Sequence, residues 1–488
     1  MKVVIIGSGV AALAAAARLT HAGFHVHVFE KMATPGGKLS EKWIGQYRFD
    51  LGPSLFTLPE NVEEVLDLFG KNRSSFSYKR LNPVCEYFYE DGTRFSAAAD
   101  HTVYVEKLSE VFNEKKHTIE KFLKSSKATY ELTAPVFLKS ELSFSKLLFK
   151  VDTYRAIIQL YKLPLLGSLN GSLKKRFQSE KIIQLFNRYA TYNGSNPYST
   201  PAMMQLIPHL ENGIGAFLPE KGMYDISRTL YNLAHENGAV FNFNSSVEEI
   251  IHDGSKVKGV RVNGEVISSE IVISNLDITP TYRYLLKNFK APERLLNQEK
   301  SSSALIFYWG VKAEFSEMHV HNIFFSDNYK EEFDHIFLRK DLYSDPTVYV
   351  NITSKECTQD APVGCENWFV MINVPHLAGQ DWPDLIEKSR KRIIAKLSRI
   401  LKKDIDSLIE VEEVLTPQLI QDRTGSFLGS LYGNASNNTF AAFRRHNVRS
   451  NDLKGMYFCG GSVHPGGGIP LCMFSGKLVA EAVKEEYL

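Results

Sequence analysis

The first thirty residues constrain the fold of this chain more than any other stretch. An apolar run at residues 2–6 ends at Gly7-Ser8-Gly9-Val10-Ala11-Ala12, and the alanine-rich stretch that follows predicts a helix to Leu19. A second apolar run, residues 26–29, ends at Glu30, about twenty residues beyond the glycine turn. The order strand, glycine turn, helix and strand is that of a βαβ unit.

This βαβ unit predicts a dinucleotide-binding site. Gly7 permits the tight turn, and Gly9 lets a pyrophosphate approach the main-chain N–H groups at the positive end of the helix dipole. Ala12 replaces the usual third glycine and is small enough to keep the helix close to the strand. Glu30 stands where a carboxylate accepts from a ribose hydroxyl. A glycine turn in an ordinary α/β domain is the alternative, and it does not explain the position of Glu30.

A second glycine loop, Pro35-Gly36-Gly37-Lys38, follows soon after, and Lys31 precedes it. A protein that binds only NAD has no need of a second anion-binding turn here. An FAD held in an extended conformation does need one, near its pyrophosphate and flavin. The two loops together therefore favour FAD, although Gly36-Gly37 taken alone is also compatible with a plain surface turn.

A third glycine loop lies near the other end of the chain. An apolar run at 455–459 leads into Gly460-Gly461-Ser462-Val463-His464-Pro465-Gly466-Gly467-Gly468-Ile469-Pro470, and a helix is predicted from about Leu471 to Glu485. The dipole of that helix can stabilise negative charge on a reduced flavin. We therefore predict that Gly9 and Gly468 meet on one ligand.

The length of 488 residues suggests two or three domains. We predict an α/β fold in which a discontinuous FAD-binding, Rossmann-like βαβ domain carries an inserted α+β substrate domain. The FAD-binding domain takes residues 1–74, 216–284 and 450–488. Residues 75–215 form a helical region for substrate and membrane contact, and residues 285–449 form the sheet and helices of the substrate domain.

Composition narrows the possible functions. A net charge of +2 does not support general attraction to nucleic acid. The five cysteines are scattered and have no metal-binding spacing, so we expect reduced thiols and no metal site. The first residues form a strand rather than a signal peptide, and no apolar run is long enough to span a bilayer. We therefore expect a cytoplasmic protein.

Residues 139–176 differ from their surroundings in charge. This stretch carries eight basic and two acidic residues, with apolar side chains at helical spacing. Such a helix can lie on an anionic lipid surface. A helix packed on its own domain with a basic outer face is an equally good interpretation of the pattern alone.

The glycine loops and two internal segments resemble the FAD-dependent carotenoid desaturases, the phytoene-desaturase-like branch of the amine-oxidase-like flavoproteins. The internal segments are Phe49-Asp50-Leu51-Gly52-Pro53 and Arg188-Tyr189-Ala190-Thr191-Tyr192-Asn193-Gly194-Ser195-Asn196-Pro197-Tyr198. The second of these, with His209-Leu210-Glu211, looks most like the hydroxycarotenoid 3,4-desaturases. Phytoene or neurosporene desaturases are the near alternative.

Three positions depart from the family pattern. Lys38 replaces the commoner arginine, which keeps the charge but loses the bidentate fork. Gly461 and Ser462 stand where related flavoproteins carry an acid for the ribityl chain. Carried over onto this sequence, the FAD-binding residues are Gly7, Gly9, Ala11, Ala12, Glu30, Lys31, Gly36, Gly37, Lys38, Gly52, Pro53, Ser54, Val247, Gly460, Gly461, Ser462, Gly468, Ile469 and Pro470.

The resemblance implies removal of two hydrogens from adjacent carbons of a polyene, with hydride transfer to the flavin. Glu211 and His209 are the candidate bases, each with a structural, hydrogen-bonded role as the alternative. A carotenoid must be taken from the membrane, which makes residues 139–176 the predicted docking surface on the inner face of the cell membrane. Oxygen or a quinone would accept the electrons.

Two other functions are compatible with the predicted fold. An amine or protoporphyrinogen oxidase would use the same flavin on a different substrate. A non-catalytic binder related to GDP-dissociation inhibitors would keep the fold without the flavin.

Overall fold

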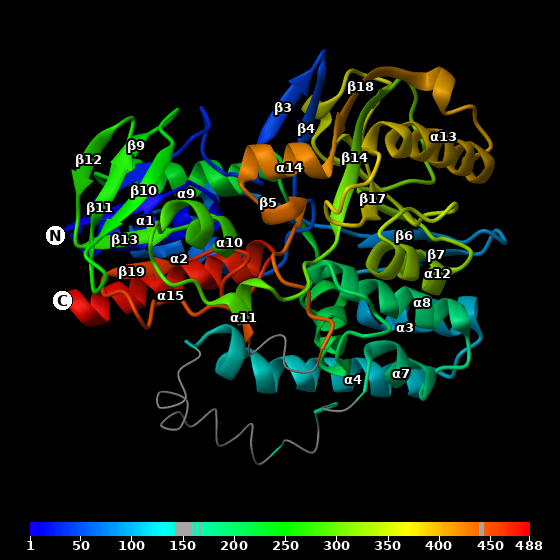
Figure 1. Cartoon of the computed structure of the whole chain (residues 1–488). Helices are drawn as coiled ribbons and strands as arrows, with labels where there is room; N and C mark the ends of the chain where they lie inside the picture. The colour runs from blue at the N-terminus through cyan, green and yellow to red at the C-terminus, as the bar shows by residue number, and fades with distance from the viewer. Residues whose placement is uncertain (142–158, 160–162, 165–166, 439–443) are drawn as a thin grey trace.

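A five-stranded parallel sheet joins three segments that are far apart in the sequence (Figure 1). Its order is β19 (Met456–Phe458), β13 (Ile271–Ser274), β1 (Lys2–Ile6), β2 (His25–Phe29) and β9 (Val240–Asn242). The start, middle and end of the chain therefore build one sheet. The predicted α/β fold with a discontinuous Rossmann-like domain is confirmed.

The computed structural model describes residues 1–141, 159, 163–164, 167–438 and 444–488. Most of the basic stretch predicted at 139–176 lies outside the described residues, including Lys146, Lys150, Arg155 and Lys162. The basic residues of this stretch that the structure describes are Lys139, Lys174, Lys175 and Arg176.

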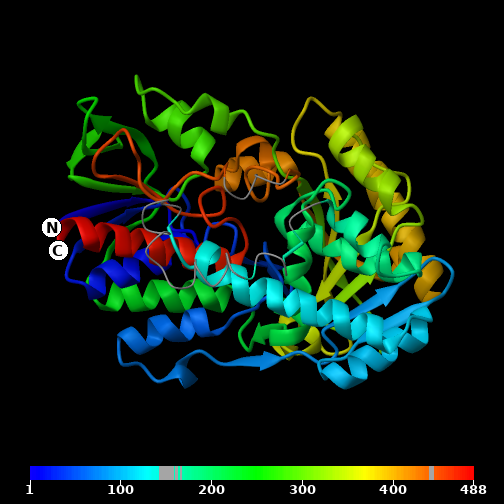
Figure 2. The ribbon, with the colours of Figure 1, turned by 90° about the horizontal axis from the view of Figure 1, so that it is seen from below.

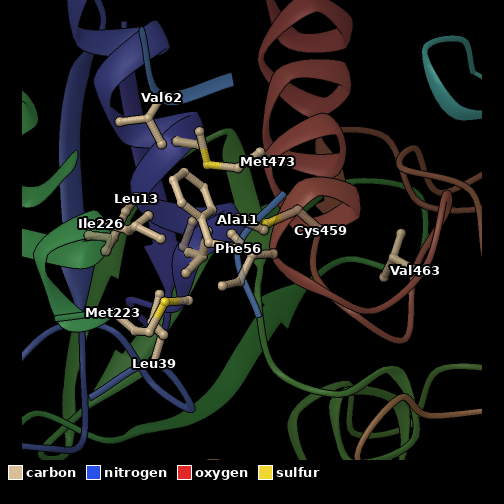
Figure 3. Close-up of a cluster of buried hydrophobic side chains, with 14 of the residues drawn as sticks. Ala11, Leu13, Leu39, Phe56, Val62, Met223, Ile226, Cys459, Val463 and Met473 are labelled. Carbon is tan, nitrogen blue, oxygen red and sulfur yellow. The ribbon is translucent and has the colours of Figure 1, made fainter. Parts of the chain in front are cut away.

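Helices cover the parallel sheet (Figure 2). Helix α1 (Val10–His21) contacts β1 and β2 and packs against α9 (Tyr224–Glu236) and α15 (Ile469–Tyr487), and α2 (Glu60–Leu68) contacts all three of these helices. Small side chains allow α1 and α15 to approach closely, because a Cβ built on Gly476 would lie 2.4 Å from the carbonyl oxygen of Ala11. Side chains from both ends of the chain, such as Ala11 and Met473, share the resulting core (Figure 3).

A second, seven-stranded sheet forms the other half of the molecule (Figure 1). Its order is β18 (Ile409–Leu415), β14 (Ser303–Val311), β17 (Glu366–Val374), β16 (Val348–Ile352), β15 (His321–Phe324), β6 (Cys85–Phe88) and β7 (Arg94–Ala97). Strands β6 and β7 come from residues 75–215, which we predicted as a helical region separate from the substrate-domain sheet at 285–449. The structure places both strands in that sheet, because a short strand in the sequence does not reveal which sheet it joins.

The two faces of this sheet have different roles. Alternate residues such as Phe307, Trp309 and Val350 pack against α13 (Trp382–Leu401) in a closed hydrophobic core. The residues between them, including Ile306 and Phe369, point to the opposite side, toward the parallel-sheet domain.

The remaining elements complete the two halves. A three-stranded antiparallel sheet, β10 (Val247–His252), β11 (Val257–Val262) and β12 (Glu265–Ser268), contacts β13. Two small antiparallel sheets each have two strands, namely β3 (Glu41–Ile44) with β4 (Tyr47–Asp50), and β5 (Tyr78–Arg80) with β8 (Phe217–Pro219). The other helices are α3 (His101–Phe112), α4 (Lys116–Thr133), α7 (Leu169–Lys174), α8 (Glu180–Asn187), α10 (Ile278–Pro280), α11 (Glu293–Leu296), α12 (Tyr329–Asp334) and α14 (Pro417–Thr424). Among the described helices, none combines the length and apolar character needed to cross a bilayer.

The close crossing of α1 and α15 gives the first testable prediction. Gly476→Val places a branched side chain against the backbone of Ala11 and forces the two helices apart, so we expect the free energy of unfolding to fall by about 2–3 kcal/mol. Chemical denaturation measures the change. The matched control is Glu481→Val, at an exposed position of the same helix. Equal losses in the two variants would contradict a role for close helix packing.

Candidate functional site

The first two glycine loops lie directly on each other. The Gly36 N–H donates to the Ser8 carbonyl at 2.8 Å, and a Cβ built on Gly37 would lie 3.4 Å from the Cα of Gly9. Gly36 has a φ of +114°, which favours glycine. The Gly36-Gly37 turn is therefore part of the predicted site and not a plain surface turn.

Glu30 is fixed at the carboxyl end of β2 by three hydrogen bonds. One carboxylate oxygen accepts from the Ser8 N–H at 2.7 Å and from the Ser8 hydroxyl at 2.8 Å, and the other accepts from the Met32 N–H at 2.8 Å. The residue is buried, yet it lines the cavity described below. A carboxylate held in this way has further acceptor capacity for a ribose hydroxyl.

The N-terminus of α1 is open to a ligand. Among the described residues, no side chain caps this helix, and Val10 and Ala11 line the cavity. The Gly9 N–H is held separately by the Asn275 side-chain oxygen at 3.0 Å. The unpaired N–H groups of a first helical turn, together with the helix dipole, suit a pyrophosphate.

Asn275 also joins the first glycine loop to the third. Its side-chain nitrogen donates to the Cys459 carbonyl at 3.1 Å, while its oxygen holds Gly9. The sequence did not single out Asn275. Its position at the carboxyl end of a parallel strand, where ligands bind in such sheets, was the available signal.

The third glycine loop is held by Arg445, which the sequence did not single out. Its guanidinium donates to the carbonyls of Gly461 at 2.9 Å, Tyr432 at 3.1 Å and Asn434 at 3.1 Å. Burial lowers the pKa of Arg445 to about 10. Gly468 then caps α15 with a φ of +102°, which presents the start of that helix to the cavity.

All three loops line one cavity of about 770 Å³. The predicted FAD-binding residues that line it are Gly7, Gly9, Ala11, Glu30, Lys31, Gly36, Gly37, Lys38, Gly52, Pro53, Ser54, Val247, Gly460, Gly461, Ser462, Gly468, Ile469 and Pro470. Ala12 is not one of the described residues in the lining; it is buried in the helix packing. Gly9 and Gly468 thus line the same cavity. The part of the cavity that the glycine loops line fits FAD.

Lys38 supplies a half-buried cation in this cavity. Its ammonium donates to the Leu431 carbonyl at 2.7 Å. Burial lowers the pKa of Lys38, although the nearby Asp277 carboxylate opposes the shift. Leu431 belongs to a segment at 420–433 that also lines the cavity and was not predicted. Its closely spaced glycines at 425, 429 and 433 were the signal for a loop that approaches a ligand.

The cavity continues across the inner face of the seven-stranded sheet. Alternate residues of four neighbouring strands and their ends line it, namely Ala304, Ile306, Phe369, Met371, Asn373, Thr347, Tyr349, His321 and Ile323. Most of these side chains are apolar. The FAD-binding half of the cavity is therefore continuous with a surface that suits a long apolar substrate.

A buried ion pair lies at this end of the cavity. An Nη atom of Arg188 donates to Glu211 at 2.8 Å and to the Tyr87 hydroxyl at 2.7 Å. The same carboxylate accepts from the hydroxyls of Tyr189, at 2.9 Å, and of Tyr192. Burial disfavours the charge of Arg188, but Glu211 together with Tyr192, Tyr87 and Tyr189 outweighs burial and holds the pKa of Arg188 well above its usual range.

The two candidate bases lie in different places. Glu211 lines the cavity and is 2% exposed. His209 is half-buried against Tyr130, with ring centroids 5.5 Å apart, and is not one of the described residues that line the cavity. Of the two, only Glu211 is therefore at the substrate side of the site.

Comparisons with known proteins agree with this geometry. The model of a family described as flavin containing amine oxidoreductase matches residues 10–484. A 1-hydroxycarotenoid 3,4-desaturase from Flavobacterium sp. is 51% identical over 99% of both chains, and a 4,4'-diapolycopene oxygenase from Methylomonas sp. is 31% identical over 99% of this chain and 98% of its own. The crystal structure of an oxidoreductase from Methanosarcina mazei aligns with a TM-score of 0.65 at 16% identity, covering 99% of this chain and all of the other.

Glu30 gives a testable prediction about the cofactor. Glu30→Gln removes the charge that accepts from a ribose hydroxyl, so we expect the Kd of FAD to rise roughly ten- to a hundredfold, or about 1.5–3 kcal/mol. Titration of the apoprotein with FAD, followed by flavin fluorescence, measures it. The control Glu265→Gln changes an exposed residue of β12. An unchanged Kd in Glu30→Gln would show that this carboxylate does not bind the nucleotide.

Proposed function

Because the chain belongs to the flavin containing amine oxidoreductase family, we propose that it is an FAD-dependent carotenoid desaturase that forms the 3,4 double bond of a 1-hydroxylated carotenoid. One observation carries this proposal most strongly. The cavity that begins at the glycine loops continues without a break over the apolar inner face of a β-sheet. A small amine would have no use for so long an apolar surface.

The apolar part of the cavity binds the substrate and fixes its position. Side chains such as Ile306, Phe369 and Met371 offer a surface on which each buried CH₂ group gains about 0.8 kcal/mol over water. A rigid sheet fixes where the polyene lies relative to the glycine loops. Fixing two reacting groups in this way can supply several orders of magnitude of rate.

The redox chemistry belongs to the cofactor. When bound, FAD accepts a hydride from a carbon of the substrate. The residues of the chain hold the polyene and exclude water, and the charge left on a conjugated chain is spread over many carbons. The proton lost in the same reaction therefore does not demand a strong base.

The role of Glu211 as that base stays a prediction. Its carboxylate accepts hydrogen bonds from Arg188, Tyr189 and Tyr192, so proton uptake would weaken a buried ion pair. These contacts favour a role in which Glu211 holds Arg188 and Tyr192 in place beside the substrate. Oxygen or a membrane quinone is the proposed final electron acceptor.

Product analysis tests the proposed function. The purified protein is incubated with FAD and liposomes that contain either a 1-hydroxylated carotenoid or the non-hydroxylated carotenoid of the same length. We expect a new double bond in the hydroxylated compound and much slower conversion of the other. Conversion of the non-hydroxylated compound alone would favour a phytoene- or neurosporene-type desaturase, and conversion of neither would overturn the proposal.

We further propose that the protein docks on the inner face of the cell membrane through residues 139–176. A carotenoid is confined to the bilayer by the cost of hydrating its hydrocarbon chain. The described ends of the stretch support a basic surface, because Lys139, Lys174 and Lys175 are exposed. Each cation near an anionic lipid surface contributes about 1 kcal/mol.

Charge reversal tests the docking surface. The double variant Lys174→Glu and Lys175→Glu should weaken binding to anionic liposomes by at least about tenfold, since two attractions of about 1 kcal/mol each become repulsions. Liposome co-sedimentation measures it. The control, Lys388→Glu with Lys391→Glu, reverses two exposed charges on α13, on the far side of the molecule in Figure 1. Unchanged binding in the first variant would remove these two lysines from the proposed surface.

A further inference from the structure

His321 carries an unpartnered nitrogen at the substrate side of the cavity. It lies at the start of β15, lines the cavity and is only 3% exposed. Its Nδ1 is 2.7 Å from the Tyr349 hydroxyl and 3.3 Å from the side-chain nitrogen of Asn351. Within the described part of the chain, its Nε2 has no hydrogen-bond partner.

The neighbours of His321 determine which nitrogen carries the proton. The side-chain nitrogen of Asn351 also donates to the Val320 carbonyl at 2.8 Å, which fixes the orientation of that amide. An amide nitrogen only donates, so Nδ1 of His321 must accept, and Nε2 carries the hydrogen of the neutral ring. Burial and then the charge of Arg188 lower the pKa of His321 to about 3, so the ring is neutral at physiological pH.

His321 is also tied to the FAD-binding side of the cavity. The hydroxyl of Tyr349 lies 2.8 Å from the Ser54 hydroxyl, and Ser54 follows Gly52-Pro53 in the cavity lining. Two hydrogen bonds therefore connect the imidazole to a loop predicted to contact the cofactor. The imidazole thus belongs to the same hydrogen-bonded chain as Ser54, and both residues line the cavity.

A second unsatisfied donor belongs to Arg188. This residue is 7% exposed and lines the cavity, and its Nε has no hydrogen-bond partner among the described residues. The other nitrogens of its guanidinium are used by Glu211, Tyr87 and Tyr192. Two buried N–H groups without acceptors thus belong to residues that line the substrate side of the cavity.

We propose that the Nε2–H of His321, assisted by Arg188, donates a hydrogen bond to the hydroxyl oxygen of the substrate and so selects the hydroxylated carotenoid. This inference rests on the proposed function and deepens it. Carbon 1, which carries the hydroxyl oxygen, is separated from the carbon 3–carbon 4 bond by carbon 2 alone. A donor that fixes this oxygen therefore also fixes which bond reacts, and an end without the oxygen leaves the N–H unpaired.

The test measures discrimination in the FAD-loaded enzyme. The ratio of kcat/KM for a 1-hydroxylated carotenoid to that for its non-hydroxylated counterpart is compared between the wild type and His321→Phe. We expect the ratio to fall roughly 10- to 100-fold, because the variant keeps an aromatic ring but loses the donor. The loss should come from the hydroxylated substrate. His321→Gln, whose amide nitrogen can replace Nε2 as donor, should recover most of the ratio.

A binding measurement separates recognition from turnover. Enzyme whose FAD has been reduced with dithionite cannot accept a hydride, so the Kd of the hydroxylated substrate can be measured from the shift of its absorbance. His321→Phe should raise this Kd by about tenfold or more and leave the Kd of the non-hydroxylated compound unchanged. The matched control is His376→Phe, a half-buried histidine that is not among the described residues lining the cavity.

The possible failures are distinguishable. If the wild type converts neither carotenoid, the proposed function itself is wrong. If the wild type prefers the hydroxylated compound and His321→Phe keeps both the preference and the Kd, the function stands and this inference is wrong. If His321→Phe instead raises the Kd of FAD without changing the ratio, the N–H serves the cofactor and the inference is equally wrong.

Discussion

The backbone contact between glycine loops is the constraint on which the rest of the structure depends. Gly36 donates to the Ser8 carbonyl, and Asn275 holds both Gly9 and the carbonyl of Cys459. These contacts need main chains that approach each other without side chains between them. A Cβ on Gly9 would lie 2.6 Å from the Asn275 oxygen, so glycine is the residue that permits the clamp. Once the three loops are fixed, the start of α15 is presented to the cavity that α1 also opens into.

The meeting of the three glycine loops also determines where the seven-stranded sheet lies. The chain leaves the parallel sheet three times, after β2, β9 and β13, and the first and third excursions supply the strands of the seven-stranded sheet. The inner face of that sheet and the glycine loops line the same cavity. One face of the inserted sheet is sealed by α13, with Trp309 and Val350 in a closed core. The alternation of side chains then leaves its other face free to line the cavity. The cofactor-binding and substrate-binding surfaces therefore enclose one continuous cavity, and the same sheet separates this cavity from the hydrophobic core behind it.

The sequence predicted the cofactor half of the site far better than the substrate half, for a physical reason. Gly7, Gly9 and Glu30 act within one βαβ unit, so their spacing along the chain carries their geometry in space. Asn275, Arg445 and His321 act across long sequence separations, and each is a single polar residue in a strand or loop without a spacing signal. Their roles depend on which strands are neighbours, and neighbours such as β6 and β15 could not be inferred from short apolar runs.

The polar end of the cavity shows how one charge can serve an apolar site. A buried guanidinium is costly unless its hydrogen bonds are satisfied, and Glu211 with the tyrosine hydroxyls does this for the terminal nitrogens of Arg188. The pair is nearly neutral as a whole, so it does not make the cavity generally polar. What it leaves is one buried donor without an acceptor on Arg188, and the neutral imidazole of His321 carries a second. The apolar part of such a lining binds any hydrocarbon chain through the apolar area that it buries. The donors distinguish one chain from another by a single oxygen, because a buried N–H stays unpaired only when the bound chain lacks that oxygen.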